Sequence, residues 1–233
     1  MNDIGIPDFV RVENRSKPMA KPLVWSYTML HTYENICPHQ AYRRFIKKDI
    51  PFQETDAMRK GNEAHSALEY RLSGGKPLPP HMQQYEPIVA PLADRGAKAE
   101  EWVGINRDGK FCDSRTADFG RGKIDVNLVR GEVAYLLDYK TGKVREEPFE
   151  LEVQAVFLKA RHPELKVIKA RYAWLAEVRL GKLHDVSDTA ATWSRIGYIT
   201  AKIAADRWTG EFTKRRSGLC GWCPVKDCEH NPG

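Results

Sequence analysis

The segment GKIDVNLVRGEVAYLLDYKTGK, residues 122–143, contains two runs of strand-forming residues on either side of an Arg-Gly pair. Val, Ile, Leu and Tyr dominate these runs, so residues 118–129 and residues 132–139 are predicted to be β-strands. Arg130 and Gly131 suit a tight turn, because glycine accepts the backbone conformations that such turns need. The segment therefore predicts an antiparallel hairpin.

Three charged residues lie on this hairpin, with Asp125 on the first strand and Asp138 and Lys140 on the second. Side chains alternate along a strand, so Asp138 and Lys140 share a face and Tyr139 points the other way. The run VAYLL before Asp138 is apolar and indicates a buried strand. Two carboxylates there could bind Mg²⁺ or Mn²⁺ while a lysine orients water, although an ordinary ion pair is the alternative.

The rest of the chain alternates between helical and strand patterns. Helices are predicted from Ser26 or Thr28 through Ile36, over 40–48, over 56–72 with a buried stripe that includes Met58, over 149–160 and over 189–208. A further strand is predicted over 167–178, and residues 93–103 suggest a short helix that leads into a strand. This order favours an α/β (α+β) fold with a mixed sheet flanked by helices.

Composition narrows the functional class. The chain has 233 residues, 42% of them hydrophobic, and a formal net charge of +6, which suits a protein that handles a polyanion but also many others. No window is apolar enough to span a membrane, and the first 22 residues lack the apolar segment of a signal peptide. We expect a cytoplasmic protein with residues 1–22 as a flexible arm and residues 23–233 as one domain.

Four motifs together resemble the RecB-like branch of the PD-(D/E)XK nucleases. GKID (122–125) and DYKTG (138–142) are similar to its G-x-x-D and D-x-K-T-G signatures, RKGNEAHSALE (59–69) to its histidine helix, and EVQAVFLKA (152–160) to its glutamine helix. The resemblance implies a restriction-endonuclease-like core and a Mg²⁺- or Mn²⁺-dependent nuclease. Its implied metal ligands are His65, Asp125, Asp138 and the Tyr139 carbonyl, and Lys140 and Gln154 are its implied catalytic residues.

Gly61 and Leu158 are the two residues of these motifs that need a separate explanation. Gly61, four residues before His65, would be unfavourable inside a helix, so it is predicted to start the helix or to permit a close approach. The family has an aromatic residue four positions after the glutamine, where this chain has Leu158. The chain therefore departs from the family pattern at this position.

Four of the five cysteines form a second constellation. Cys220, Cys223 and Cys228 crowd the C-terminus, and Cys37 precedes a proline near the N-terminus. C-x-x-C with a third cysteine is typical of zinc or iron–sulfur sites, and Cys112 lies outside the set. SYTMLHTYENICP (26–38) resembles the cluster-bearing branch, which includes CRISPR-associated exonucleases and nuclease domains of helicase–nucleases, and this implies a [4Fe-4S] cluster. Zinc or a three-ligand arrangement stays open, because the last spacing is C-x4-C and not the C-x5-C that is commoner in this branch.

Such a cluster would join residues 23–50 to residues 209–233 as one lobe. Basic residues flank the cysteines and would converge with them, and nearby aromatic residues could stack on unpaired bases. The alternative is a solvated basic face with aromatic residues in the core. The basic set is Arg43, Arg44, Lys47, Lys48, Lys214, Arg215 and Arg216, and the aromatic set is Tyr42, Phe45, Trp208 and Trp222.

Three hypotheses follow for function. The first is a metal-dependent DNA nuclease, most of all an exonuclease on single-stranded ends, working with recombination, helicase or CRISPR-adaptation proteins. The second is a non-catalytic DNA-binding or assembly subunit that keeps the nuclease fold. The third is a structural zinc protein of unrelated function, which would leave the ordered His, Asp and Lys motifs unexplained.

Overall fold

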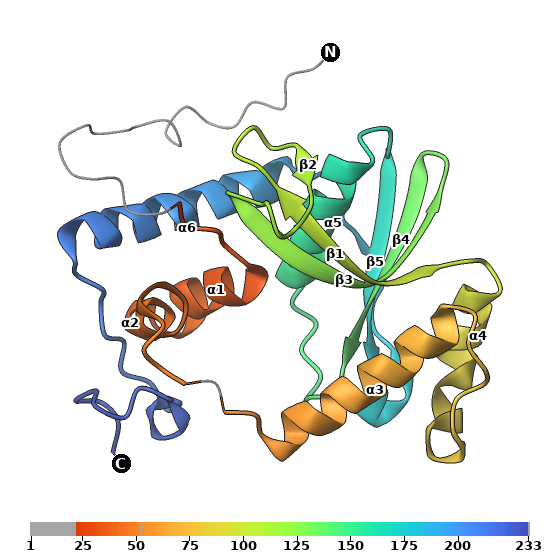
Figure 1. The fold of residues 1–233 in the computed structure, drawn as a ribbon, viewed down its shortest axis with the longest axis horizontal. Coiled ribbons are helices and arrows are strands. Elements are labelled where there is room, and N and C mark those ends of the chain that lie inside the picture. Colours follow the sequence, from red (N-terminus) through yellow and green to blue (C-terminus); the bar gives the residue numbers. More distant parts are fainter. Residues whose placement is uncertain (1–21, 52, 233) are drawn as a thin grey trace.

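The computed structural model describes residues 22–51 and 53–232 (Figure 1). The flexible arm predicted for residues 1–22 lies outside the described residues, except for Pro22. The described chain forms a mixed sheet flanked by helices, which confirms the predicted fold class. No helix among the described residues is both long and apolar enough to cross a membrane.

The sheet has seven strands among the described residues, in the order β2-β1-β3-β4-β5-β6, and β7 pairs with β5 beside this path. Only β4 and β5 run parallel, because α5 crosses over between them, and the other described pairs are antiparallel. The strands are β1 Lys98–Ile105, β2 Phe111–Cys112, β3 Gly120–Arg130, β4 Val133–Lys140, β5 Val167–Trp174, β6 Arg179–Leu180 and β7 His184–Asp185.

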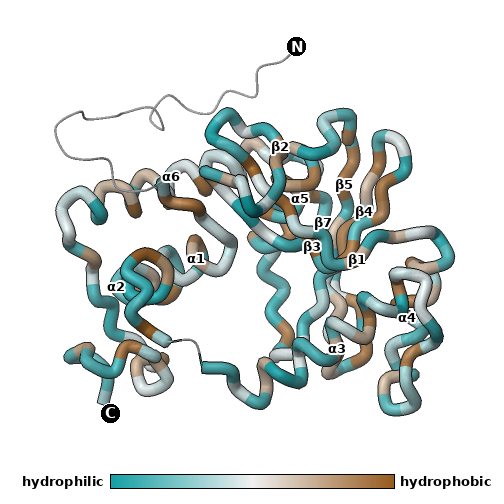
Figure 2. The backbone as a smooth tube through the Cα atoms, in the orientation of Figure 1, coloured by the Kyte–Doolittle hydropathy of each residue, from teal (hydrophilic) through white to brown (hydrophobic). Residues whose placement is uncertain are grey.

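One face of the sheet packs against α5 (Phe149–Arg161). The helix α6 (Ala190–Thr209) packs against α5, and α1 (Tyr27–His31) packs against α6. Trp25, Phe149 and Phe157 are fully or almost fully buried in this cluster. Such aromatic side chains remove large apolar areas from water and dominate the stability of a core. Figure 2 shows hydrophobic stretches along β4 and β5.

The opposite face packs against α3 (Asp56–Leu72) and α4 (Glu86–Ala93). Thr55 caps α3, since its side chain accepts a hydrogen bond from the Met58 amide. Gly61 lies inside this helix, and a Cβ there would stand 3.2 Å from the Thr141 hydroxyl oxygen. Gly61 thus lets α3 approach the end of β4, which confirms the close approach and excludes the helix start.

Several predicted boundaries need correction. The hairpin turn is formed by Gly131 and Glu132 and not by Arg130, and Gly131 has the positive φ of +55° that glycine accepts. The strand predicted over 167–178 ends at Trp174, because a 3₁₀ turn of Leu175–Glu177 follows. Met58 is 41% exposed, since it lies in the first turn of α3, before the buried stripe of Gly61, Ala64, Leu68 and Leu72.

The N-terminal helices lie beside the C-terminal tail. The predicted first helix is α1 with a π-helical turn, η2 (Thr32–Ile36), and Ser26 caps it. The predicted helix 40–48 is α2 (Pro38–Ala41) followed by another π-helical turn, η3 (Tyr42–Lys47). The His39 amide donates to the Thr213 carbonyl at 3.1 Å, so α2 meets the C-terminal tail here, and Figure 1 shows the two side by side.

Candidate active site

The sheet opens between β3 and β4 at the position of Asp125. Their pairing ends at Val126 and Leu137, and beyond this point the Tyr139 amide donates a 3.0 Å hydrogen bond to Asp125 Oδ2. The carboxylate therefore takes the place of a backbone acceptor and bridges the two strands. Asp125 is only 8% exposed, so its charge lies inside the protein.

His65 brings α3 to this opening. Its Nδ1 lies 3.5 Å from Asp125 Oδ2 and 3.6 Å from Glu100 Oε1, and its ring meets that of Tyr139 edge-on. Ligand atoms of His65, Glu100 and Asp125 all lie within 4.8 Å of one another. An imidazole nitrogen with two carboxylate oxygens is a donor set that could hold a divalent metal ion.

Asp138 and Lys140 lie on the other face of β4, toward α5. Gln154 Nε2 donates a 2.6 Å hydrogen bond to Asp138 Oδ1, and Lys140 Nζ lies 2.6 Å from Asp138 Oδ2. Lys140 Nζ is also 2.7 Å from Glu150 Oε2. Glu150 and Gln154 are four residues apart on α5 and so project from the same side of this helix.

Burial and like charge shift the acid–base properties of these groups. Burial raises the pKa of Asp125 to about 6, and the negative charge of Asp138 adds to the rise. Burial and Asp138 likewise raise the pKa of Glu150 to about 7. Burial opposes the charged form of Lys140, but Asp138 and Glu150 outweigh it and raise its pKa, so the lysine stays an ammonium group. It can therefore orient water or stabilise negative charge, but it does not accept a proton.

The sequence-predicted residues His65, Asp125, Asp138, Lys140 and Gln154 thus gather around the end of β4. The side chain of Tyr139 is buried against α3, on the face opposite Asp138, as the alternation predicts. No described contact tests its carbonyl oxygen as a ligand. Asp138 is not among the three residues with ligand atoms within 4.8 Å of one another, although its charge acts on Asp125.

Sequence reasoning missed Glu100 and Glu150. Glu150 precedes the predicted Gln154 by four residues, and this spacing was a usable signal. No motif or spacing in the neighbouring sequence marked Glu100 as a site residue. It comes opposite Asp125 only through the register of β1 and β3, in which Ala99 pairs with Val126 and Glu101 with Ile124.

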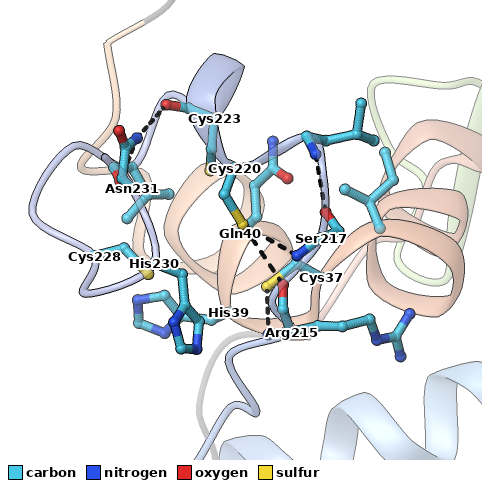
Figure 3. A pocket seen from close by; sticks show the side chains of 13 residues that line it. Cys37, His39, Gln40, Arg215, Ser217, Cys220, Cys223, Cys228, His230 and Asn231 are labelled. Atoms are coloured by element: carbon cyan, nitrogen blue, oxygen red, sulfur yellow. Dashed lines mark hydrogen bonds between the residues drawn. The ribbon is translucent and has the colours of Figure 1, made fainter. Parts of the chain in front are cut away.

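The four predicted cysteines line one pocket between the N-terminal helices and the C-terminal tail (Figure 3). We call this the cysteine pocket, lined by Cys37, Cys220, Cys223 and Cys228. All four are free thiols, and the remaining cysteine, Cys112, lies far away on β2. The predicted convergence of the two chain ends is therefore present.

The hydrogen bonds, the burial and the spacing of the four thiols in the cysteine pocket bear on whether they could bind a metal. The Arg215 amide donates to Cys37 Sγ and the Ser217 amide to Cys220 Sγ, each at 3.3 Å. Burial raises the pKa of Cys223 despite a backbone hydrogen bond, and the other three thiols add to the rise. Among the described residues no three of these sulfurs approach one another within 4.8 Å, so they are less tightly grouped than His65, Glu100 and Asp125.

Three of the seven basic residues predicted around the cysteine pocket form ion pairs. Arg43 pairs with Asp49 and Asp227, and Lys214 pairs with Glu229. Lys47 also pairs with Asp49. The predicted phosphate-contacting rim is therefore partly neutralised by acidic residues, which sequence spacing did not reveal.

The predicted stacking residues divide into two kinds. Tyr42 stacks on Phe212 at 4.4 Å between ring centroids, and Phe45 packs against the core. Trp208 and Trp222 are 50% and 83% exposed. Only the two tryptophans of this set present wide aromatic surfaces to solvent.

Comparisons with known proteins bear on the fold. No family model matches the chain, and no curated protein matches its sequence. A protein of known structure from Eubacterium rectale, named "Putative exonuclease", is 12% identical and covers 91% of each chain with a TM-score of 0.57. The structure of SSO0001 is 14% identical, covers 93% of this chain and 90% of its own, and has a TM-score of 0.48. The likeness to the first shows a nuclease fold of the restriction-endonuclease type.

Proposed function

We propose that this chain is a metal-dependent nuclease that hydrolyses phosphodiester bonds in DNA. The observation that carries the proposal is the end of β4, around which Asp125, Asp138, Lys140 and His65 gather. Burial raises the pKa values of Asp125 and Glu150 and the negative charge of Asp138 adds to both rises, so a divalent cation would stabilise the charged forms of these carboxylates. The nuclease-type fold adds support.

In this proposal His65, Asp125, Asp138 and the Tyr139 carbonyl hold Mg²⁺ or Mn²⁺. When bound, the ion polarises the phosphodiester and favours hydroxide over water. Lys140, held as an ammonium group between Asp138 and Glu150, orients the attacking water and stabilises the charge that develops on the phosphate. Gln154 fixes the Asp138 carboxylate through its 2.6 Å hydrogen bond.

The substrate we propose is DNA with free single-stranded ends, cleaved as an exonuclease. The exposed rings of Trp208 and Trp222 support this choice, because unpaired bases stack on aromatic surfaces without sequence preference. The name of the Eubacterium rectale protein agrees with the exonuclease part of this proposal. Such an enzyme would work in the cytoplasm with recombination, helicase or CRISPR-adaptation proteins.

We propose further that the cysteine pocket holds a [4Fe-4S] cluster, with residues 23–50 and 209–233 as its lobe in the single domain 23–233. The support is the convergence of four free thiols from distant segments, with amide donors at two of them. Hydrogen bonds to sulfur are a usual feature of such centres. Zinc is the rival occupant, and His39 and His230 also line the pocket.

Cleavage of end-labelled DNA tests the nuclease. Linear and circular substrates, single-stranded and duplex, are incubated with Mg²⁺, Mn²⁺ or EDTA. Asp138→Asn and Lys140→Ala should each abolish cleavage and keep the fold, whereas Lys143→Ala, an exposed lysine on the adjacent loop, should remain active. DNA binding without cleavage by the wild-type protein would favour a non-catalytic binding subunit, and full activity of either active-site variant would overturn the assignment.

Anaerobic purification tests the cysteine pocket. A cluster should give a brown protein with about four iron atoms and labile sulfide per chain. A colourless protein with stoichiometric zinc would replace the cluster by a zinc site and would leave the nuclease proposal untouched.

A further inference from the structure

Glu100 has an unusual place in β1. Its neighbours Ala99 and Glu101 pair with Val126 and Ile124 on β3, so Glu100 lies opposite Asp125. Its own φ is +52°, in the left-handed region. Glu100 and Asp125 are not among the paired residues of β1 and β3. A residue with a side chain keeps such a backbone only where surrounding contacts hold it, and such positions gather at functional sites.

The two carboxylate oxygens of Glu100 have different surroundings. Oε2 forms an ion pair with Lys123 Nζ. Oε1 is buried, has no hydrogen-bond partner within residues 22–51 and 53–232, and faces His65 Nδ1 at 3.6 Å. The side chain is only 6% exposed, so solvent does not satisfy this oxygen fully. A cation among His65, Glu100 and Asp125 would do so.

Lys123 connects this group to the surface. It pairs with Trp102 across β1 and β3, and its Nζ lies 5.8 Å from the centre of the Trp102 ring. The lysine is therefore held on two sides, by the ring and by Glu100 Oε2. With Oε2 engaged in this way, Oε1 is left pointing toward His65. A partner that fixes a ligating carboxylate is a common feature of metal centres.

We propose that Glu100 is a direct ligand of the divalent metal through Oε1, and that Lys123 is the residue that positions it. This inference rests on the metal centre of the proposed nuclease and adds a ligand from β1 to those from α3, β3 and β4. Glu101 offers a matched control on the same strand. It is also mostly buried, but its carboxylate contacts Arg161 and Asn127 on the other face of the sheet.

The test measures Mn²⁺ binding to chelator-treated protein by calorimetry and by electron paramagnetic resonance, without any substrate. Glu100→Gln should weaken Mn²⁺ binding at least 10-fold, whereas Glu101→Gln should stay within about twofold of the wild type. Asp125→Asn, a ligand variant of the proposed function, should also lose binding. If Glu100→Gln does not fold, Glu100→Gly replaces it, because glycine accepts the positive φ.

The Lys123→Met variant distinguishes two roles of Lys123, the positioning of Glu100 and the direct repulsion between its charge and the bound cation. Loss of a positive charge beside a cation should by itself tighten Mn²⁺ binding. We expect weaker binding instead, because Glu100 loses the partner that orients it, and we expect Lys123→Arg to restore it. Equal or tighter binding by Lys123→Met overturns the positioning role.

The outcomes distinguish the two proposals. If Glu100→Gln binds Mn²⁺ as the wild type does while Asp125→Asn is impaired, Glu100 is not a ligand and the proposed nuclease centre stands. If the wild type binds no Mn²⁺, or Asp125→Asn binds it normally, the metal centre of the proposed function fails as a whole.

Discussion

Replacing Asp125 by asparagine should stabilise the metal-free protein and abolish metal-dependent cleavage. The Asp125 carboxylate is buried next to Asp138, and its pKa rises from an ordinary 3.8 to about 6. The charged form therefore opposes folding. Asparagine has nearly the same shape, carries no charge, and can still accept the hydrogen bond from the Tyr139 amide.

The pH range of this effect follows from the two pKa values. Below pH 3.8 the carboxyl group is protonated in both folded and unfolded chains, so the effect is absent. As the pH rises, the unfolded chain releases this proton first, and the wild type loses stability relative to the Asp125→Asn variant until about pH 6. Above pH 6 the difference is complete, at about 2–3 kcal/mol. For a chain of this length, this is roughly 5–10 °C in Tm.

Thermal unfolding followed by circular dichroism in EDTA, from pH 4 to pH 8, measures the difference. Asp108→Asn, in the exposed hairpin loop between β1 and β2, is the control and should show no such trend. Adding Mn²⁺ should raise the Tm of the wild type far more than that of Asp125→Asn. Equal stability of the variant and the wild type at pH 8, or a difference that does not shrink toward pH 4, would refute the reasoning.

Three further changes probe other parts of the structure. Gly61→Leu should weaken Mn²⁺ binding in calorimetry at least 10-fold. The new side chain would meet Thr141 and move α3, and His65 with it, away from the opening between β3 and β4. Unchanged binding would contradict this. Gln154→Leu should lower kcat about 10- to 100-fold at saturating metal, since Asp138 loses its hydrogen bond, and a wild-type kcat would remove Gln154 from the site. Cys37→Ser should release bound iron or zinc and lower Tm by more than about 5 °C, and a variant with full metal content would exclude Cys37 as a ligand.

Local patterns were sufficient to predict much of the fold. The hairpin of β3 and β4 was predicted because apolar runs, an intervening glycine and strand alternation all depend on neighbours in sequence. The same alternation correctly separated Asp138 and Lys140 from Tyr139. Errors occurred at element ends, as at Trp174, where the apolar pattern of the strand continues into a 3₁₀ turn.

Residues of the candidate site were predicted only where they lie on helices or strands that the local sequence pattern identifies. Glu100 depends on the register of β1 and β3 and on a left-handed backbone that glutamate does not favour, and neither is visible in the local sequence. The ion pair of Arg43 with Asp227 likewise joins residues from opposite ends of the chain. Such non-local pairs need the fold before they can be identified.

A cluster or zinc ion bound in the cysteine pocket would close most of the chain into a ring. Cys37 and Thr213 are 176 positions apart, and the Cys37 thiol lies 3.8 Å from the Thr213 carbonyl oxygen. Closing a ring of this size restricts the unfolded chain by about 5 kcal/mol if the closure is covalent or metal-held. If a protease nicked the loop after β4 once, the two fragments would then stay joined under denaturing conditions until the cysteines released the metal. The Asn231 side chain donates to the Cys223 and Val225 carbonyls, so Asn231 holds the segment that carries the last two cysteines in a fixed fold.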